Sequence, residues 1–517
     1  MKYVRAAAPF LIAAFVFVAF RKVLRLWWMY DDPFQLRMLR DVALRSLLMG
    51  KDFYSGAPLF TPLLILSLKL DSVLFGTNAT GFYAHQLISL AAALVAEYFM
   101  LRLWCSRANS LAAVLVTAMG APLLSTVPLL MCRHYIEGAL FAFAAVITFV
   151  LTMRGRRLAV LSALAYFLAA CAKEIFLPLA VLLLAFPEGT FRARLRVLTG
   201  HAIAAIAYAV WRLSAVGFDV GSYGVLGTPG ERWKQLAELP WSLVRQLAGS
   251  GHAAGWIAVA AVMACAIFVF VRRPAARAVI VSAFVLSVLP LLPLATAIER
   301  RYAFALSICA ACAVAFLPRA WPAFVVAALA LLAFRVDWAP AYRDLLHMSD
   351  ETRVMSMLRR DDILLGPITP PTTMLELAHL TGTEAHAYYD ELQLCEPGRR
   401  FGRIFEFDPA RREIVETNRA AIDRVCTSIV QKPISVEIRF DREKALYWTL
   451  GPYTAGRWSF VIAEGLVAYD VTREGGFRRP GWDQFQMRVR YIAPEGWRTY
   501  SPLVPVDSRI PLTVYRR

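Results

Sequence analysis

The sequence predicts a mainly α membrane protein with about eleven transmembrane helices and a C-terminal α+β domain outside the cytoplasm. The chain has 517 residues, of which 58% are hydrophobic, and its mean hydropathy of +0.52 is above that of ordinary soluble proteins. The apolar residues are concentrated between Ala6 and Phe334, in blocks separated by short basic segments, whereas residues 335–517 have the composition of a soluble domain. We therefore expect a membrane domain at 1–334 and a globular domain at 335–517.

The individual spans follow from the length of the apolar blocks. A span needs about 20 mostly apolar residues, and fewer where the helix is broken or ends in a polar cavity. The segments that meet this requirement are 6–21, 86–104, 109–130, 134–152, 158–172, 174–187, 197–213, 253–271, 278–296, 302–317 and 321–334.

Arginines set the expected orientation of these spans. Every second loop between them is basic, which places the N-terminus in the cytoplasm under the positive-inside rule. The long first outer loop, about residues 22–85, and the C-terminal domain then lie on the periplasmic side. This is the arrangement of a multi-pass protein of a bacterial inner membrane.

The number of predicted spans depends on how residues 158–186 fold. Residues 158–186 could form a single long helix with Lys173 and Glu174 in its middle, or two short helices that meet at these residues. The hairpin places both flanking arginine clusters on the cytoplasmic side. It also moves two ions from the bilayer centre, where each would cost about 2.5 kcal/mol or more.

The first outer loop and the C-terminal domain carry further periodic patterns. Apolar residues recur at helical spacing across Phe34–Leu48, which predicts an interfacial helix with Asp32 near its N-cap and Pro33 in its first turn. Period-two alternation across 434–440 and 485–491 predicts half-buried strands, and three Gly- or Pro-containing segments predict turns (Gly451-Pro452, Gly475-Gly476 and Pro494-Glu495-Gly496).

Two cysteines indicate a possible disulfide, and the net charge indicates which binding partners to expect. Cys395 and Cys426 lie in the C-terminal domain and could form a disulfide if that domain is periplasmic. The net charge of +18 is explained by cytoplasmic loops. Because the cations are not gathered on one soluble face with aromatic residues between them, we expect the lipid bilayer and no nucleic acid as a partner.

Adjacent carboxylates at Asp31 and Asp32 form the first candidate site. Such a pair can supply a general base together with a charge or metal partner. The alternative is that Asp32 caps the interfacial helix and Asp31 is merely solvated. Lys173 and Glu174, at the expected hairpin tip, are either functional or an interfacial salt bridge that ends the helix.

Two further polar clusters lie on the expected outer side. Glu299-Arg300-Arg301-Tyr302 breaks the positive-inside pattern, and arginine is well suited to binding phosphate, so a phosphorylated lipid could bind here. The alternative is snorkelling to lipid headgroups. Arg133-His134-Tyr135-Ile136-Glu137 could contact a sugar or a phosphate, or form part of an interfacial belt.

In their order along residues 1–334, these motifs resemble the GT-C class of membrane glycosyltransferases, which use polyprenyl-phosphate sugars, as in dolichyl-phosphate-mannose and aminoarabinose transferases. The resemblance rests on Asp31-Asp32, on Ala57-Pro58-Leu59 before an apolar run, on Lys173-Glu174 followed by Pro178, and on Glu299-Arg300-Arg301-Tyr302 at the opening of a late span.

This resemblance implies a reaction. Asp31 or Asp32 would be the base that acts on the acceptor hydroxyl, and the other would assist or hold a divalent cation, Mg or Mn. Arg300 and Arg301, with help from Lys173, would hold the leaving lipid phosphate. The supporting residues would be Glu174, Glu299, Tyr302, His134 and Glu137. The sugar would pass from a polyprenyl-phosphate donor to a glycan, lipid or protein acceptor of the cell envelope.

Two other classes of function compete with this one. A transporter or flippase for a lipid-linked or anionic substrate would place ionisable residues near the midplane of pseudo-symmetric halves, whereas the ions here gather at one face. A non-catalytic envelope protein that binds a partner through its outer domain would not need Asp31, Asp32 or the two arginines.

Overall fold

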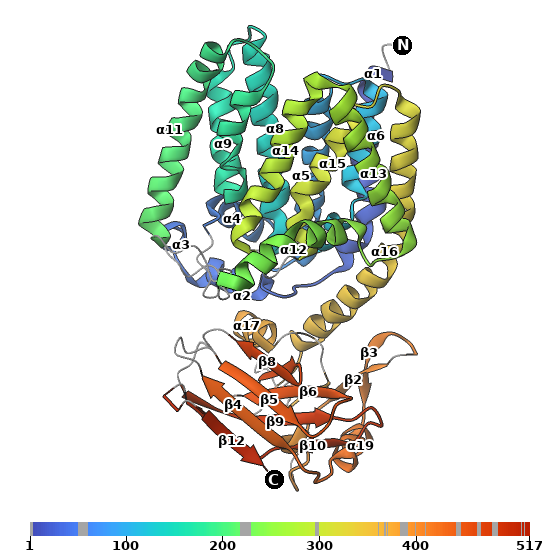
Figure 1. The fold of residues 1–517 in the computed structure, drawn as a ribbon. Helices are drawn as coiled ribbons and strands as arrows, with labels where there is room; N and C mark the ends of the chain where they lie inside the picture. The colour runs from blue at the N-terminus through green and yellow to red at the C-terminus, as the bar shows by residue number, and fades with distance from the viewer. Residues whose placement is uncertain are drawn as a thin grey trace. The chain divides into compact units, whose positions relative to one another are not determined.

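The computed structural model divides into two compact units, one helical and one rich in strands (Figure 1). The helical unit is formed by Met1–Leu26 and Gln35–Leu345, and the C-terminal unit by Trp27–Phe34 and Leu346–Arg517. The structure describes residues 4–49, 60–217, 229–294, 299–359, 361–366, 369, 371–382, 391–398, 400–408, 410–440, 446–462, 467–477, 484–507, 509–510 and 512–516.

Helices make up the first unit, including short 3-10 helices labelled η. The first half contains α1 (Val4–Phe20), η1 (Arg21–Arg25), α2 (Asp32–Asp41), α3 (Leu44–Met49), α4 (Pro62–Phe75), α5 (Ala79–Leu101), α6 (Arg107–Ala118), α7 (Ala121–Thr126), η2 (Leu130–Cys132) and α8 (Arg133–Met153). The second half contains α9 (Ala159–Ala172), η3 (Glu174–Phe176), α10 (Leu179–Leu182), η4 (Leu183–Ala185), α11 (Phe191–Val216), α12 (Pro229–Ala248), α13 (Ala253–Arg272), α14 (Pro274–Val288), η5 (Leu289–Leu294), η6 (Arg300–Ala303), α15 (Phe304–Ala315) and α16 (Ala320–Met355).

Six helices within the described residues are long and apolar enough to cross a membrane, by their length and composition. They are Ala7–Arg25, Ala79–Leu101, Leu130–Met153, Phe191–Val216, Ala253–Arg272 and Ala320–Met355. Shorter apolar helices occupy Ala159–Ala172, Glu174–Ala185 and Ala276–Leu292. These helices indicate a membrane protein, but the predicted count of about eleven spans is not confirmed.

The predicted hairpin at Lys173 is confirmed. Lys173 is extended, with φ −156° and ψ 133°, and separates α9 from η3. A Cβ on Gly138, near the start of α8, would meet the Phe176 ring at 2.3 Å. Ten residues later, Phe186 packs against Phe149 near the end of α8, with ring centroids 6.4 Å apart. The chain therefore reverses at Lys173 and runs back along α8.

The hairpin brings two arginine segments to one end of the helical unit. The Arg154 guanidinium lies 3.4 Å from the Glu188 carboxylate, and Arg194 donates to the backbone carbonyl of Glu188 at 3.1 Å. Arg154 also donates to the carbonyl of Leu103, just after α5. The beginning of α5 therefore lies at the opposite end of the unit.

Two predicted helices are broken, and the predicted domain boundary lies within a helix. The expected interfacial helix at Phe34–Leu48 is two helices, α2 and α3, because the chain leaves helical conformation at residues 42–43. The expected span 109–130 breaks where Gly120 is extended and Pro122 opens α7. The domain boundary expected after residue 334 falls inside α16, which continues to Met355.

Helix α4 lies within the segment expected to be an outer loop. Its 14 apolar-rich residues are too few for an unaided span, and they include Lys69 and Asp71. Both ions have partners: Lys69 donates to the backbone carbonyl of Leu39, and Asp71 contacts Arg133. Satisfied charges allow this helix to pack within the unit.

The C-terminal unit contains two facing antiparallel sheets. One has the strand order β12-β4-β5-β8, and the other β10-β9-β6-β7 with β11 also paired to β9. These strands are β4 (Ser435–Phe440), β5 (Leu446–Gly451), β6 (Arg457–Ile462), β7 (Val467–Val471), β8 (Glu474–Phe477), β9 (Gln484–Ile492), β10 (Arg498–Tyr500), β11 (Val504–Asp507) and β12 (Leu512–Arg516). The alternation predicted for 434–440 and 485–491 is confirmed, because alternate residues of both strands enter one shared core.

One of the predicted turns in this unit is wrong. Gly475 and Gly476 lie inside β8, where they pair with Trp448 and Tyr447 of β5. A Cβ at either glycine would meet the ring of its partner at less than 3 Å, so glycine is needed for close approach and not for a turn. Pro494-Glu495-Gly496 does form the turn between β9 and β10, with Gly496 at φ +93°.

A smaller subdomain precedes the sandwich. It contains β1 (Ile363–Leu365), α17 (Pro371–Thr381), α18 (Glu391–Leu394), β2 (Ile404–Asp408), β3 (Glu413–Thr417) and α19 (Arg419–Ser428). Strand β2 lies between β1 and β3. A disulfide joins Cys395, just after α18, to Cys426 of α19.

The hairpin can be tested with single cysteines and a membrane-impermeant maleimide. We expect Arg156→Cys and Arg192→Cys to be labelled from the same side of the membrane, because both segments lie at one end of the helical unit. Thr77→Cys, before α5, should be labelled from the opposite side. Opposite labelling of Arg156→Cys and Arg192→Cys would show that residues 158–186 cross the membrane once.

Candidate functional site

The beginning of α8 holds two polar clusters, because Arg133 and His134 are neighbours and point to different sides of the helix. Both side chains are buried: Arg133 is 0% exposed and His134 is 4% exposed. Charged and polar groups at such positions need partners or a ligand. The two clusters differ in this respect.

Arg133 is fully satisfied by α4 and α5. Its Nη1 atom lies 2.5 Å from Asp71 Oδ2 and 3.2 Å from Ser67 Oγ. Its Nη2 donates to the carbonyl of Phe82 at 2.8 Å, and its Nε donates to Gln86 Oε1 at 3.1 Å. A buried guanidinium with a carboxylate and several oxygen acceptors is stable, and this arrangement fixes three helices to one another.

Asp71 also binds His85. Its Oδ1 lies 2.6 Å from His85 Nδ1, while its Oδ2 contacts Arg133. Glu137, one turn after Arg133, accepts a hydrogen bond from Ser67 Oγ at 2.6 Å. The predicted supporting residue Glu137 is therefore part of this structural network, which the sequence did not reveal.

The second cluster gathers Lys173, Arg301 and His134. Lys173 Nζ lies 5.4 Å from the centroid of the Tyr135 ring. Arg301 Nη1 lies 3.8 Å from the sulfur of Met131, two residues before the start of α8. Lys173 and Arg301 both lie close enough to His134 to act on it electrostatically. Three predicted site residues from distant parts of the chain therefore meet.

These two cations have little negative charge around them. Glu299 pairs with Arg301 at 2.9 Å, but its side chain is 55% exposed. Glu174 turns away to Arg212 of α11, at 3.2 Å. Among the side chains that the structure describes, no carboxylate lies within ion-pair distance of Lys173. The cluster therefore has an excess of positive charge.

His134 adds unused hydrogen-bonding capacity. Both of its ring nitrogens are buried, and no described side chain hydrogen-bonds either of them. Its ring packs against Tyr135, with centroids 4.5 Å apart. An oxygen-rich ligand could supply the missing partner, since a ring N–H donates and the other ring nitrogen accepts.

Tyr302 and Arg300 occupy η6 with Arg301. Tyr302 is buried, and its ring centroid lies 5.3 Å from the Arg301 guanidinium carbon, a cation–π distance. Arg300 is half-buried, and no described carboxylate pairs with it. The two arginines therefore differ: Arg301 is held in the cluster, whereas Arg300 is not fixed by an ion pair within the described chain.

Asp31 and Asp32 belong to the C-terminal unit, whereas Lys173 and Arg301 belong to the helical unit. Asp32 is 3% exposed, and its Oδ2 accepts a hydrogen bond from the backbone N–H of Met29 at 3.1 Å. This bond is made to the chain before α2, and the N-cap role expected for Asp32 stays a prediction. The meeting of an acidic base with the lysine and arginines stays a prediction.

A divalent cation also stays a prediction. Within the described part of the chain, no group of three or more His, Cys, Asp or Glu side chains could hold a metal ion. Asp32 is already engaged by Met29, so the pair offers at most a partial ligand set. Ala57-Pro58-Leu59, part of the family resemblance, lies outside the described residues.

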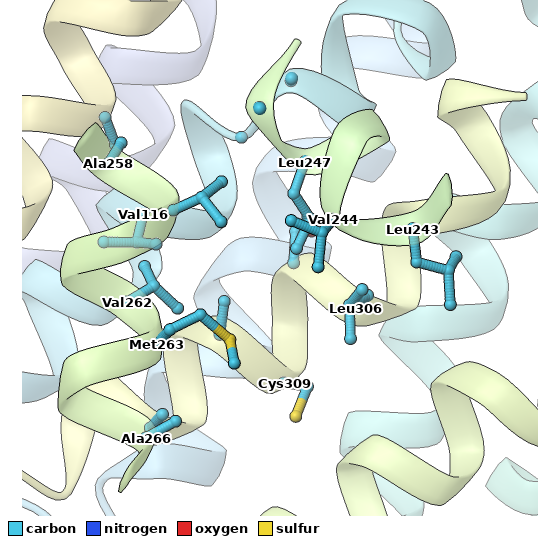
Figure 2. Close-up of a pocket in the computed structure, with 18 of the residues that line it drawn as sticks. Val116, Leu243, Val244, Leu247, Ala258, Val262, Met263, Ala266, Leu306 and Cys309 are labelled. Atoms are coloured by element: carbon cyan, nitrogen blue, oxygen red, sulfur yellow. The ribbon is translucent and has the colours of Figure 1, made fainter. Parts of the chain in front are cut away.

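An apolar cavity of about 500 Å³ lies next to the Arg301 segment (Figure 2). Helices α6, α7 and α12–α16 supply its walls, and the figure shows mostly aliphatic side chains together with Met263 and Cys309. Leu306 lines the cavity three residues after η6, and the helices α7 and α12 contact η6 as well. The cavity therefore adjoins the segment that carries Arg300 and Arg301.

Asp337 of α16 lies at this cavity, at the end of α12. It is 4% exposed and accepts hydrogen bonds from the hydroxyl and the backbone N–H of Ser250, which follows α12. A Cβ on Gly249 would overlap the Asp337 carboxylate, so glycine is required there. These contacts fix the C-terminal end of α12.

Comparisons with known proteins give structural likenesses alone. No family model matches the chain, and no curated protein matches it. Among solved structures, the Archaeoglobus fulgidus oligosaccharyltransferase in the apo form is 14% identical over 70% of this chain and 58% of its own, with a TM-score of 0.41. The same enzyme tethered to an acceptor peptide containing the NVT sequon is 13% identical over 74% of this chain and 64% of its own, also at 0.41.

This chain thus spans less than two thirds of the length of either archaeal structure. The functional proposal below rests on the chain's own residues.

The sequence missed Asp71, His85, Ser67 and Gln86 as polar residues of the helical unit. A signal was present, since Lys69 and Asp71 interrupt an apolar stretch, and ions in such a stretch are paired. The partner Arg133 could not be inferred, because 62 residues separate it from Asp71.

The buried ion pair gives a stability prediction. Asp71→Asn should lower the free energy of unfolding by about 3–5 kcal/mol, because it leaves the buried Arg133 guanidinium without its charge partner. Thermal unfolding in detergent would measure this loss. The control is Glu174→Gln: its pair with Arg212 is partly exposed, so about 1 kcal/mol or less should be lost. Equal losses would contradict the assigned role of Asp71.

Proposed function

We propose that this chain is an integral membrane glycosyltransferase of the bacterial inner membrane. It transfers a sugar from a polyprenyl-phosphate donor to a cell-envelope acceptor on the periplasmic side. One observation carries the proposal: the cationic cluster of Lys173 and Arg301, centred on the buried His134, lies beside an apolar cavity. A phosphate attached to a long hydrocarbon chain matches both features.

The phosphate end of the donor fits the cationic cluster. Guanidinium groups bind phosphate oxygens through paired charge-assisted hydrogen bonds. Arg301 has one exposed carboxylate partner, Glu299, so it keeps donors for a ligand. Because the cluster is partly buried, its attraction for the negatively charged phosphodiester is screened less than it would be in water.

The lipid end of the donor fits the apolar cavity. Its walls are almost wholly hydrocarbon, and burial of apolar surface contributes about 25 cal/mol per Å². Leu306 lines the cavity and follows η6, the segment that carries the arginines, by three residues. A polyprenyl chain in the cavity would therefore present its phosphate to Arg301.

The chemistry then needs a base and a stabilised leaving group. In the proposed step, a carboxylate removes the proton from an acceptor hydroxyl, the oxygen attacks the anomeric carbon, and the bond from that carbon to the phosphate oxygen breaks. Asp31 or Asp32 is the proposed base. Arg301 and Lys173, with Arg300, stabilise the charge that develops on the departing lipid phosphate.

Loss of Arg301 should remove this stabilisation. We expect Arg301→Ala to reduce sugar transfer by about 10²–10³-fold, the usual effect of losing one such donor. Lys173→Ala should also lose activity, as should whichever of Asp31→Asn and Asp32→Asn removes the base. The measurement is transfer of labelled sugar from polyprenyl-phosphate donors in membranes, with the amount of folded protein measured for each variant.

The matched control is Arg277→Ala. Arg277 donates to backbone carbonyls of α13, away from the cluster, so its variant should retain transfer. If wild type consumes no donor, or if Arg301→Ala and Arg277→Ala behave alike, the proposed function fails. In that case a transporter or a binding protein becomes the better interpretation.

The cavity predicts a dependence on donor chain length. Ala266 points into the cavity from α13 (Figure 2). Ala266→Phe should fill part of it and raise the KM for a long polyprenyl donor several-fold, with less effect on a donor carrying a short chain. Steady-state kinetics with both donors would test this, and equal effects on the two donors would argue against a lipid in the cavity.

A further inference from the structure

The five-stranded sheet of the C-terminal unit has one apolar face and one polar face that is rich in arginine. Alternate residues of β9 enter the core (Met487, Val489 and Tyr491). Arg488 and Arg490 therefore point to the opposite face. Tyr500 of β10 pairs directly with Arg490, so Tyr500 and Arg498 share that face. Basic residues thus gather on the side of the sheet away from its core.

Glu391 is the carboxylate that contacts two of these arginines directly, while Asp470 and Asp507 lie elsewhere on the same face. Glu391 of α18 is 9% exposed and lies 3.0 Å from Arg490 Nη1 and 3.3 Å from Arg498 Nη1. The hydroxyl of Tyr500 donates to the same carboxylate. Two guanidiniums therefore share the Glu391 carboxylate, and Arg490 also donates to Ser459 Oγ, which in turn donates to Asp470. Arg498 Nε is buried with no partner among the described groups.

Residues of this network line two neighbouring clefts, since Glu391 and Arg498 line one and Tyr500 lines the other. The first has a volume of about 370 Å³, and Glu391, Glu406, Arg424, Ser428 and Arg498 supply its polar lining. Arg424 donates to both oxygens of Glu406, at 3.1 and 3.0 Å. Its lining therefore offers guanidinium donors beside carboxylate acceptors. A sugar hydroxyl, which both donates and accepts, matches such a lining.

The second cleft, of about 530 Å³, is basic. Lys432 and Arg488 line it together with Gln431, Thr499, Tyr500 and Ser501, and none of the described residues around it is acidic. Lys432 is exposed, and its Nζ lies 3.7 Å from the centroid of the Trp497 ring. Within the described chain no carboxylate forms an ion pair with Lys432. An anionic group can therefore approach it directly.

We propose that these two clefts together bind an acidic saccharide, one that carries carboxylate or phosphate groups. Its hydroxyls occupy the first cleft, against the Arg–Glu pairs, and its acidic group occupies the second, against Lys432 and Arg488. The shared Glu391 network holds the floor between the two clefts. If the proposed function is correct, this saccharide belongs to the acceptor, but the binding site does not depend on transfer activity.

The ammonium group of Lys432 is not needed to hold its own segment to the sheet. Its backbone N–H bonds Thr499 Oγ1 at 3.1 Å, and Thr499 Oγ1 donates to the Lys432 carbonyl at 3.0 Å. Hydrogen bonds of the Lys432 backbone therefore hold this segment against β10, and the Lys432 ammonium group takes no part in them. That group remains available for a ligand, since truncation of the side chain would leave these backbone contacts in place.

Binding can be measured on the full-length protein in detergent, by isothermal titration calorimetry, with three saccharide probes and one anion. The probes are trigalacturonic acid for carboxylates, trehalose 6-phosphate for phosphate and maltotriose as a neutral trisaccharide, and the anion is citrate. We expect at least one acidic probe to bind about tenfold more tightly than maltotriose. The tighter acidic probe identifies the acidic group.

Variants then locate the site. Lys432→Ala and Arg424→Ala should each raise the Kd for the acidic saccharide by about fivefold or more. The matched control is Arg439→Ala: Arg439 is an exposed arginine on β4 of the other sheet, over Tyr447, and its loss should leave binding within about twofold. Unchanged thermal unfolding would show that all three variants fold.

Several results would overturn the proposal. They are no binding of either acidic saccharide, equal binding of maltotriose, citrate binding as tight as that of the acidic saccharides, or an equal loss in Arg439→Ala. Since no sugar transfer is measured, failure here leaves the transferase proposal standing. Loss of transfer activity alone would likewise leave the acidic-saccharide site standing.

Discussion

The contact between Arg133 and Asp71 is the constraint on which the helical unit depends. Both side chains are fully buried, and their atoms lie 2.5 Å apart. A buried guanidinium requires several oxygen acceptors at once, and these come from α4 and α5. Those helices therefore have one permitted position against α8. The same contact fixes the direction of His134, which follows Arg133 in the chain and must face the other side of the helix.

The other residues of the cationic cluster are positioned against the start of α8. The hairpin at Lys173 returns the chain along α8, so the lysine arrives beside Tyr135. The η6 segment brings Arg301 to Met131 and Cys132. One cluster on α8 is therefore neutralised and rigid, whereas its neighbour keeps excess charge. This division separates a satisfied ion-pair network from a group of cations in excess, within two consecutive residues.

The sequence predicted the parts of this arrangement that depend on local pattern. The Lys173 hairpin followed from the cost of ions in a bilayer, and the strands β4 and β9 followed from period-two alternation. The pairing of Asp71 with Arg133 could not be predicted, because it joins distant helices by side-chain geometry. The two arginines that share Glu391 were missed for the same reason. Alternation is visible within each strand, but the register that places Tyr500 opposite Arg490 is not. The hydrogen bond from the Met29 N–H to Asp32 was not predicted, because the sequence considered only a capping bond to the helix that follows.

Lys173 occupies the residue directly after the last turn of α9. The carbonyl groups at a helix C-terminus carry a partial negative charge, which attracts a nearby cation. Arg301 has a comparable companion in Glu299. Each cation is therefore tolerated in the absence of a bound anion, so the pocket need not hold its ligand permanently. If the proposed function is correct, the site releases its spent carrier lipid without unfolding of the helices around it.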